Sequence, residues 1–140
     1  MYRTILVATD DSPQADAATD AAVELAKRFD ATLHAIYVLD SRLGRTSATK
    51  EPYKQIGENA LQAIEQEAAL NDVSVTTTLV EGTPESEILD YAERHAIDLI
   101  VVGGKDKSTV ERFFIGTTAE KVVRHAPMSV LVVREETDPS

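Results

Sequence analysis

The sequence contains no cysteine and no tryptophan, and aromatic residues make up only 5% of the chain. The absence of cysteine excludes disulfides, thiolate chemistry and cysteine-ligated metal sites. No apolar run approaches the roughly 20 residues that a membrane-spanning helix needs. The first residues, MYRTILVATD, lead directly into a strand-like pattern, which is unlike a cleaved signal peptide. We therefore expect a cytoplasmic protein with no membrane attachment.

Basic residues are scarce, since 14 Lys and Arg stand against 24 Asp and Glu, for a formal net charge of −10. This charge argues against binding to a nucleic-acid backbone, which requires clustered Lys and Arg. It disfavours anionic membrane surfaces for the same reason. The acidity is typical of many cytosolic proteins. Few Lys with many Asp, Glu, Ala and Thr are also typical of a high-salt cytoplasm, and both origins stay open.

The length of 140 residues and the 43% hydrophobic content predict a single domain, 1–140, with a frayed tail at 135–140. Short apolar runs rich in β-branched residues predict strands at 4–9, 31–39, 73–80, 98–102 and 129–134. Apolar residues at helical spacing predict helices at 15–29, 53–70, 84–96 and 117–125. Residues 40–50 lack periodicity, and we expect a mobile surface loop there.

Strands that are apolar on both faces and alternate with helices predict an α/β fold with a parallel sheet covered on both sides. Right-handed crossovers make such a sheet doubly wound. Ligands bind these sheets beyond the carboxyl ends of the strands, where the strand order reverses. If the first strand is central, the loops that follow the first, second and fourth strands converge on one site.

The loop after the fourth strand, GGKDKSTVERFFIGTT at 103–118, contains glycines but neither a Walker A motif nor G-x-G-x-x-G. Gly116 and Thr117 stand where a helix begins. Free N–H groups and the helix dipole favour an anion at such a position. The alternative is that Gly116 only ends a loop and that Thr117 or Thr118 caps the helix.

The acid pair Asp10-Asp11 follows the first strand, a position from which carboxylates can hold Mg²⁺. The pair resembles the acidic pair of response-regulator receiver domains. A receiver also needs a phosphorylatable Asp after the third strand, which TTTLVEGT lacks. Gly103 and Arg134 stand where it needs a hydroxyl residue and a lysine, so we set this alternative aside. Asp11 or Ser12 is then expected to cap the first helix.

No catalytic constellation is visible in the sequence. The three histidines, His34, His95 and His125, lack metal-ligand spacing, and we expect structural roles for them. No serine lies in a G-x-S-x-G elbow. We therefore predict no catalytic residues and no dedicated metal site.

Four segments together resemble the universal stress protein family: YRTILVATDDSPQA, LHAIYVLD, DLIVVGG and IGTTAEKVVRHAPMSVLVVR. The resemblance covers essentially the whole chain. It implies a five-stranded parallel sheet of order 3-2-1-4-5 with helices on both faces, a Rossmann-like fold of the adenine nucleotide alpha hydrolase type. It also implies a role in stress response and a homodimer paired through the final strand, 129–134, whose apolar edge would otherwise be exposed.

The ATP-binding branch of that family carries G-x2-G-x9-G-[ST] after the fourth strand. Gly103 and the pair Gly116-Thr117 match this motif, whereas Asp106 replaces its middle glycine. The resemblance implies ATP or AMP as the ligand, with Mg²⁺ accompanying the nucleotide and at most slow ATP hydrolysis. The implied binding residues are Ala8, Thr9, Asp10, Val38, Gly103, Gly104, Lys105, Gly116, Thr117 and Thr118.

Asp106 predicts weakened or altered nucleotide binding, because its charge would repel a phosphate at a cost on the order of a few kcal/mol. Lys105 and Lys107 flank it and can offset the charge, and Gly104 can let the loop shift. Binding that is AMP-like rather than ATP-like and complete loss of binding both stay open. The second alternative is a nucleotide-free module of the same fold that dimerises and binds unidentified proteins.

Overall fold

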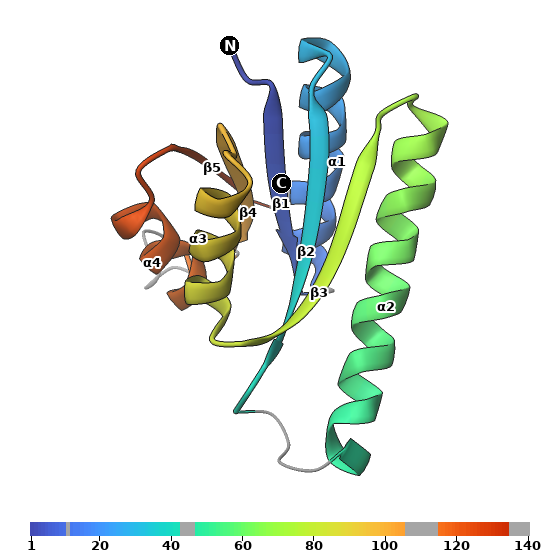
Figure 1. The fold of residues 1–140 in the computed structure, drawn as a ribbon, viewed down its shortest axis with the longest axis vertical. Helices are drawn as coiled ribbons and strands as arrows, with labels where there is room; N and C mark the ends of the chain where they lie inside the picture. The colour runs from blue at the N-terminus through green and yellow to red at the C-terminus, as the bar shows by residue number, and fades with distance from the viewer. Residues whose placement is uncertain (11, 43–46, 106–114, 135–140) are drawn as a thin grey trace, which may run out of the picture.

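The computed structural model describes residues 1–10, 12–42, 47–105 and 115–134. Within these ranges, five parallel strands form one sheet in the order β3-β2-β1-β4-β5, the order that the family resemblance implies (Figure 1). Four helices of the described residues connect them. The elements in chain order are β1 (Thr4–Thr9), α1 (Pro13–Phe29), β2 (Thr32–Asp40), α2 (Ser47–Leu70), β3 (Val75–Gly82), α3 (Pro84–Arg94), β4 (Leu99–Gly104), α4 (Thr117–His125) and β5 (Ser129–Arg134).

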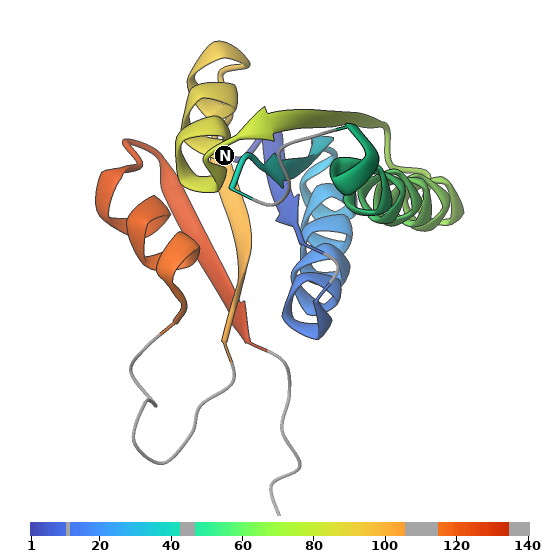
Figure 2. The ribbon, with the colours of Figure 1, turned by 90° about the horizontal axis from the view of Figure 1, so that it is seen from below.

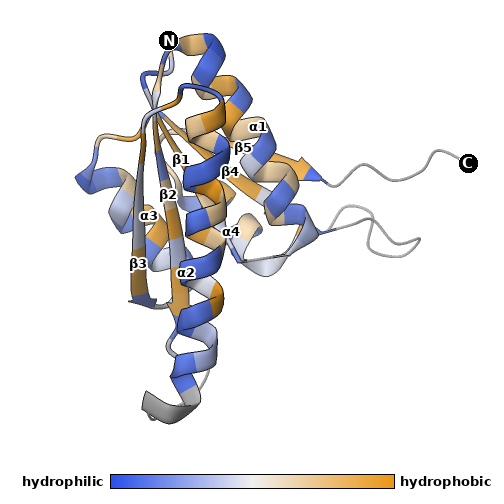
Figure 3. Cartoon of the chain, turned by 90° about the vertical axis from the view of Figure 1, so that its right-hand side faces the viewer, coloured by the Kyte–Doolittle hydropathy of each residue, from blue (hydrophilic) through white to orange (hydrophobic). Residues whose placement is uncertain are grey.

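The helices cover both faces of the sheet in pairs, as Figure 2 shows from below. On one face α1 and α2 pack against Ile5, Val7 and Leu33. On the other face α3 and α4 pack against Leu6, Ile36 and Ile100. The strands are therefore predominantly apolar between polar outer helix faces (Figure 3). Burial of both sheet faces explains why the strands read as continuous apolar runs.

The first helix begins as the sequence predicts. The Ser12 side chain accepts a hydrogen bond from the N–H of Ala15 at 3.1 Å, and Pro13 occupies the first helical turn. The helix ends at Asp30, whose φ of 54° is left-handed. Asp11, the other predicted cap, lies outside the described residues.

The predicted loop at 40–50 is partly wrong, because α2 begins at Ser47 and contains Pro52. Proline lacks an N–H and usually marks a helix start, which is why the sequence placed the boundary too late. The helical spacing in this segment predicts an apolar stripe of Ile56, Ala60, Ala63, Ile64 and Ala68, which is only partly right. Ile64 and Ala68 are buried, but Ile56 and Ala63 are exposed, and Leu61 is buried as well.

The two edges of the sheet differ in character. The β3 edge carries three threonines and Glu81, which forms an ion pair with Lys50 of α2. The β5 edge carries Val130, Leu131, Val132 and Val133. The predicted frayed tail, 135–140, lies outside the described residues. Among the helices that the structure describes, none is both long enough and apolar enough to cross a bilayer.

Candidate functional site

The central strand stops short of its neighbours. The last pair between β1 and β2 is Thr9 with Tyr37, yet β2 continues to Asp40 along β3. On the other side, β4 pairs with β1 as far as Val101 and then continues to Gly104 along β5. In the described part of the chain, two strand edges therefore face each other across the end of β1. This is the reversal point at which doubly wound sheets bind ligands.

A cavity of about 650 Å³ occupies this position, and we call it the crevice. It lies beyond the carboxyl ends of the strands, which point downward in Figure 1. It brings together all ten residues implied by the sequence: Ala8, Thr9, Asp10, Val38, Gly103, Gly104, Lys105, Gly116, Thr117 and Thr118. They come from the ends of β1, β2 and β4 and from the start of α4. Their convergence follows from the strand order, since β1 lies between β2 and β4.

The start of α4 forms an open polar end of the crevice. Gly116, the residue before the helix, has φ of 101°, a conformation that favours glycine. The N-cap position is held by Gly116, which has no side chain to accept a capping hydrogen bond, so the predicted cap at Thr117 or Thr118 is wrong. The crevice is lined by Thr117, Thr118 and Ala119, whose N–H groups belong to the first turn. An anion is stabilised at such a position by the helix dipole.

Lys105 lies beside this helix start. Its N–H donates to the carbonyl oxygen of Ile115 at 3.1 Å, which joins the two ends of the loop. A Cβ atom on Gly116 would lie 3.4 Å from the Lys105 Cγ. The lysine stem therefore runs along the glycine that precedes α4. The lysine stem and the helix start therefore lie side by side at this end of the crevice.

Gly103 and Gly104 serve the packing of the sheet as well as the crevice. A Cβ atom on Gly103 would meet the backbone of Gln14, and one on Gly104 would lie 2.7 Å from Val132 Cγ1. The glycines therefore let α1 and β5 approach β4 closely. This reason for glycine is independent of any ligand.

Two carboxylates, from the residue after β1 and from the end of β2, also line the crevice. Asp10 accepts a hydrogen bond from the N–H of Ser12 at 3.1 Å, which orients its carboxylate. Asp40 binds Arg42 through two contacts, Nε to Oδ1 at 2.9 Å and Nη2 to Oδ2 at 2.6 Å. The hydrogen bond from the Arg42 guanidinium lowers the pKa of Asp40. Asp40 therefore stays ionised and holds Arg42 at the mouth.

Sequence reasoning missed several residues that line the crevice, among them Gln14, Arg42, Tyr53 and Ile56. Tyr53 and Ile56 project from α2 with exposed fractions of 38% and 39%. Ile56 fits the helical spacing of a core residue, and an exposed aromatic residue such as Tyr53 beside a cavity is a typical ligand wall. Gly57 lets this part of α2 lie against Tyr37, because a Cβ atom there would be 2.5 Å from the ring.

Within the described ranges, no cluster of three or more His, Asp or Glu side chains could hold a metal ion. Asp11, Asp106 and Lys107, which the sequence analysis weighed for Mg²⁺ and phosphate, lie outside those ranges.

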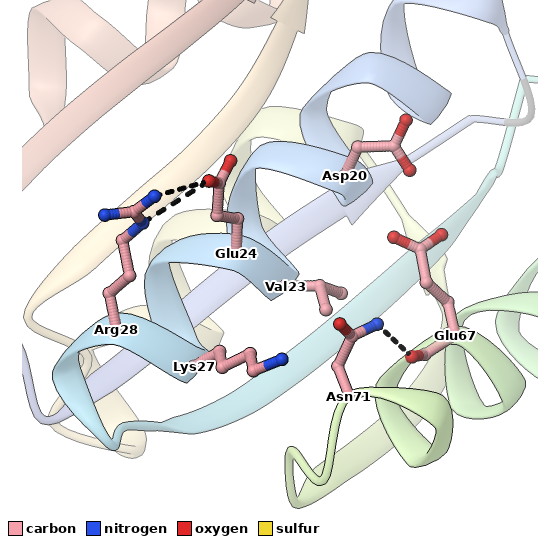
Figure 4. Close-up of a pocket in the computed structure, with 7 residues that line it drawn as sticks. All are labelled: Asp20, Val23, Glu24, Lys27, Arg28, Glu67 and Asn71. Carbon is pink, nitrogen blue, oxygen red and sulfur yellow. Dashed lines mark hydrogen bonds and ion pairs between the residues drawn. The ribbon is translucent and has the colours of Figure 1, made fainter.

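A second hollow, of about 490 Å³, lies between α1 and α2 (Figure 4). Asp20 of α1 and Glu67 of α2 direct their carboxylates into the space between the helices. Burial and the neighbouring carboxylates of Asp20 and Asp16 raise the pKa of Glu67 to about 7. The contact between α1 and α2 at this hollow therefore depends on the charge of Glu67.

The histidines lie away from the crevice lining. His34 Nδ1 is 2.6 Å from the Tyr91 hydroxyl, and the His95 ring stacks on Tyr91 with centroids 3.9 Å apart. Burial, and next the charge of His95, lower the pKa of His34. His125 is exposed at the end of α4, where a cation complements the dipole.

The chain matches the universal stress protein family over residues 1–134. The chain belongs to the universal stress protein family. A universal stress protein of Methanocaldococcus jannaschii is 35% identical over 142 residues, covering 96% of this chain and 84% of the relative.

Solved structures of the family share the fold. The universal stress protein UspA from Lactobacillus plantarum is 34% identical, with a TM-score of 0.76, and the match covers 95% of this chain and 98% of that one. The universal stress protein from Archaeoglobus fulgidus, solved in complex with dAMP, is 21% identical, with a TM-score of 0.71 and coverage of 94% and 98%. At that identity the likeness shows the fold alone.

Proposed function

We propose that this universal stress protein binds an adenine nucleotide in the crevice and acts as a nucleotide-binding homodimer in stress response. The observation that carries the proposal is the convergence of all ten residues implied by the family motif on one cavity. The dAMP complex of the Archaeoglobus fulgidus protein, which has the same fold, supports the choice of an adenine nucleotide.

The two ends of the crevice suit the two ends of a nucleotide. Val38, Tyr53 and Ile56 provide apolar surface for a base, and the unpaired edge of β2 beside them offers backbone groups for hydrogen bonds. Asp10 is oriented by Ser12 and can accept a hydrogen bond from a ribose hydroxyl. The start of α4 and Lys105 provide the anion site.

The direct test is mass spectrometry of small molecules released from the purified, denatured protein, followed by calorimetric titration with adenine nucleotides. Val38→Arg should weaken binding at least tenfold, because it places a charged side chain against the base. Val123→Arg is the matched control, since Val123 is exposed on α4 and lies outside the crevice lining. Equal affinity of the two folded variants would contradict the proposed site.

Asp106 provides a separate test of the nucleotide proposal. Asp106→Gly restores the family glycine, and we expect it to tighten ATP binding, because the repulsion of the carboxylate is removed. No change in ATP affinity would show that Asp106 does not oppose the phosphates. If the protein neither carries nor binds any nucleotide, the nucleotide-free interaction module is the better description.

The homodimer is proposed to form through β5. This strand is an edge of the sheet with four consecutive apolar residues, and Leu131 is 37% exposed. An apolar edge is expected to be covered by another strand. Leu131→Lys should yield a monomer in light scattering at micromolar concentration, whereas Thr76→Lys on the opposite edge should not. A wild-type monomer would overturn this part of the proposal.

A further inference from the structure

The face of α2 that packs on the sheet continues past the last residue that the sheet buries. The buried positions of this helix follow helical spacing and are Gly57, Leu61, Ile64 and Ala68. The same spacing continued by one turn toward the start of the helix reaches Tyr53. Tyr53 is 38% exposed, so this turn of the helix has no strand beneath it that buries its side chain.

The first turns of α2 lie at the same end of the sheet as the crevice. Residues 51–56 are exposed, and burial begins at Gly57. Lys50 forms an ion pair with Glu81 near the carboxyl end of β3. The start of the helix is therefore fixed beside the carboxyl ends of the strands, where Figure 1 shows it extending beyond the sheet.

The contact at Gly57 shows where Tyr53 lies relative to the central strand. A Cβ atom on Gly57 would lie 2.5 Å from the Tyr37 ring, so α2 touches β2 at this point. Tyr37 is paired with Thr9, the last residue of β1. Tyr53 lies one helical turn, about 5.4 Å, farther along the helix. It therefore overhangs the space beyond the end of β1, in agreement with its place in the crevice lining.

The Tyr53 ring has no specific partner in the described part of the chain. No ring contact and no hydrogen bond joins it to another described side chain. Ile56 follows it at a spacing of three residues, is 39% exposed and also lines the crevice. The two side chains present an aromatic ring and an aliphatic group to the cavity. A planar aromatic ligand can cover such a surface by stacking on the ring.

From this placement we infer that Tyr53 recognises the base of the nucleotide by stacking on it, so that α2 supplies the selectivity for a planar aromatic ligand. The inference rests on the proposed nucleotide site and assigns the residue that holds the base. The contact requires the ring of Tyr53 and not its hydroxyl group. It is independent of the phosphate, which the proposed site places at the start of α4.

The test is calorimetric titration of the full chain with adenosine and with AMP. Tyr53→Ala should weaken the binding of both ligands by the same factor, about tenfold, because it removes the stacked ring and leaves the phosphate contact unchanged. Tyr53→Phe should bind both ligands as the wild type does. Leu70→Ala is the matched control, because it removes an exposed apolar side chain of the same helix outside the crevice lining.

Each other outcome contradicts the inference in a different way. Wild-type affinities in Tyr53→Ala would overturn it and leave the nucleotide site intact. An equal loss in Tyr53→Phe would assign the contact to the hydroxyl group, and an equal loss in Leu70→Ala would assign it to the helix as a whole. A loss of AMP affinity alone would place Tyr53 at the phosphate. Failure of the wild type to bind either ligand would overturn the nucleotide proposal as well.

The absence of tryptophan from the chain allows a spectroscopic readout of the same contact. Tyr53→Trp introduces a single indole at the crevice, and stacking of adenosine on it should quench its fluorescence. Phe29→Trp is the control, because Phe29 is exposed and lies outside the crevice lining. Adenosine should leave the fluorescence of that variant unchanged. Equal signals from the two variants at saturating adenosine would exclude the stacking contact.

Discussion

A Cβ atom on Gly103 would lie 2.6 Å from both the carbonyl carbon and the oxygen of Gln14. These are backbone atoms in the first turn of α1, so they cannot rotate away as a side chain would. Gly103→Ala should therefore displace α1 from β4 and lower the free energy of unfolding by about 1–3 kcal/mol. Urea denaturation measures this change. Unaltered stability would mean that α1 shifts at no cost.

The contact between Gly57 and Tyr37 predicts that Gly57→Ala changes stability in opposite directions with and without the Tyr37 ring. In the wild type, Gly57→Ala should destabilise the protein, because the new methyl group meets the Tyr37 ring at 2.5 Å. In a Tyr37→Ala background the ring is absent. The same change should then stabilise the protein by up to about 1 kcal/mol through helix propensity. A double-mutant cycle measures the coupling, and additive effects would contradict the predicted contact.

Glu67 predicts how stability depends on pH. Its pKa of about 7 in the folded state lies above the value of 4.5 for an unperturbed glutamate, so the folded chain keeps the proton longer than the unfolded chain. The free energy of unfolding should therefore fall as pH rises from about 4.5 through 7. Solvent exposure of the carboxyl limits the effect to about 1 kcal/mol.

The matched variants of this prediction are Glu67→Gln and Glu58→Gln. The first should remove the decline between pH 5 and 8, since no charge then forms opposite Asp20. The second changes an exposed glutamate of the same helix and should leave the decline in place. If both variants keep the wild-type pH profile, Glu67 does not carry it.

His34 predicts that the stability of the fold decreases as the pH falls below neutral. Its pKa is lowered from 6.5 by burial and by the charge of His95. The folded state therefore disfavours the imidazolium, and the contribution of His34 to stability is lost as pH falls through its folded pKa. His95→Gln should raise the pKa of His34 in an NMR titration, whereas His125→Gln should not. A pKa unmoved by His95→Gln would assign the whole shift to burial.

Much of this fold was predictable because the preference of each segment for helix or strand agrees with its place in the folded chain. The strands β1 and β5 and the helix α4 have the predicted limits, since their apolar periods and flanking turn residues are unambiguous. The start of α2 was not predicted, because Pro52 is typical of a helix boundary, yet the helix begins five residues earlier, at Ser47.

The candidate site was predictable from strand ends but not from side chains. Motif spacing identified the two ends of the loop at Gly103 and Gly116. It could not reveal that Gly103 is also required by α1, nor that Arg42 is held by Asp40 at the mouth. Tyr53 and Ile56 enter the crevice from a helix far along the chain, and helical periodicity alone does not separate a core residue from a ligand wall.

The early end of β1 determines how the crevice can vary. Its depth is determined by the difference in length between β1 and its neighbours, a property of the backbone. Side-chain substitutions at the mouth can change which ligand fits without altering the sheet. An extra residue at the end of β1 that continued the pairing with β2 and β4 would extend β1 into the crevice and fill part of it. Point mutations can thus change which ligand binds. Removal of the crevice itself requires an insertion or deletion that changes the length of a strand.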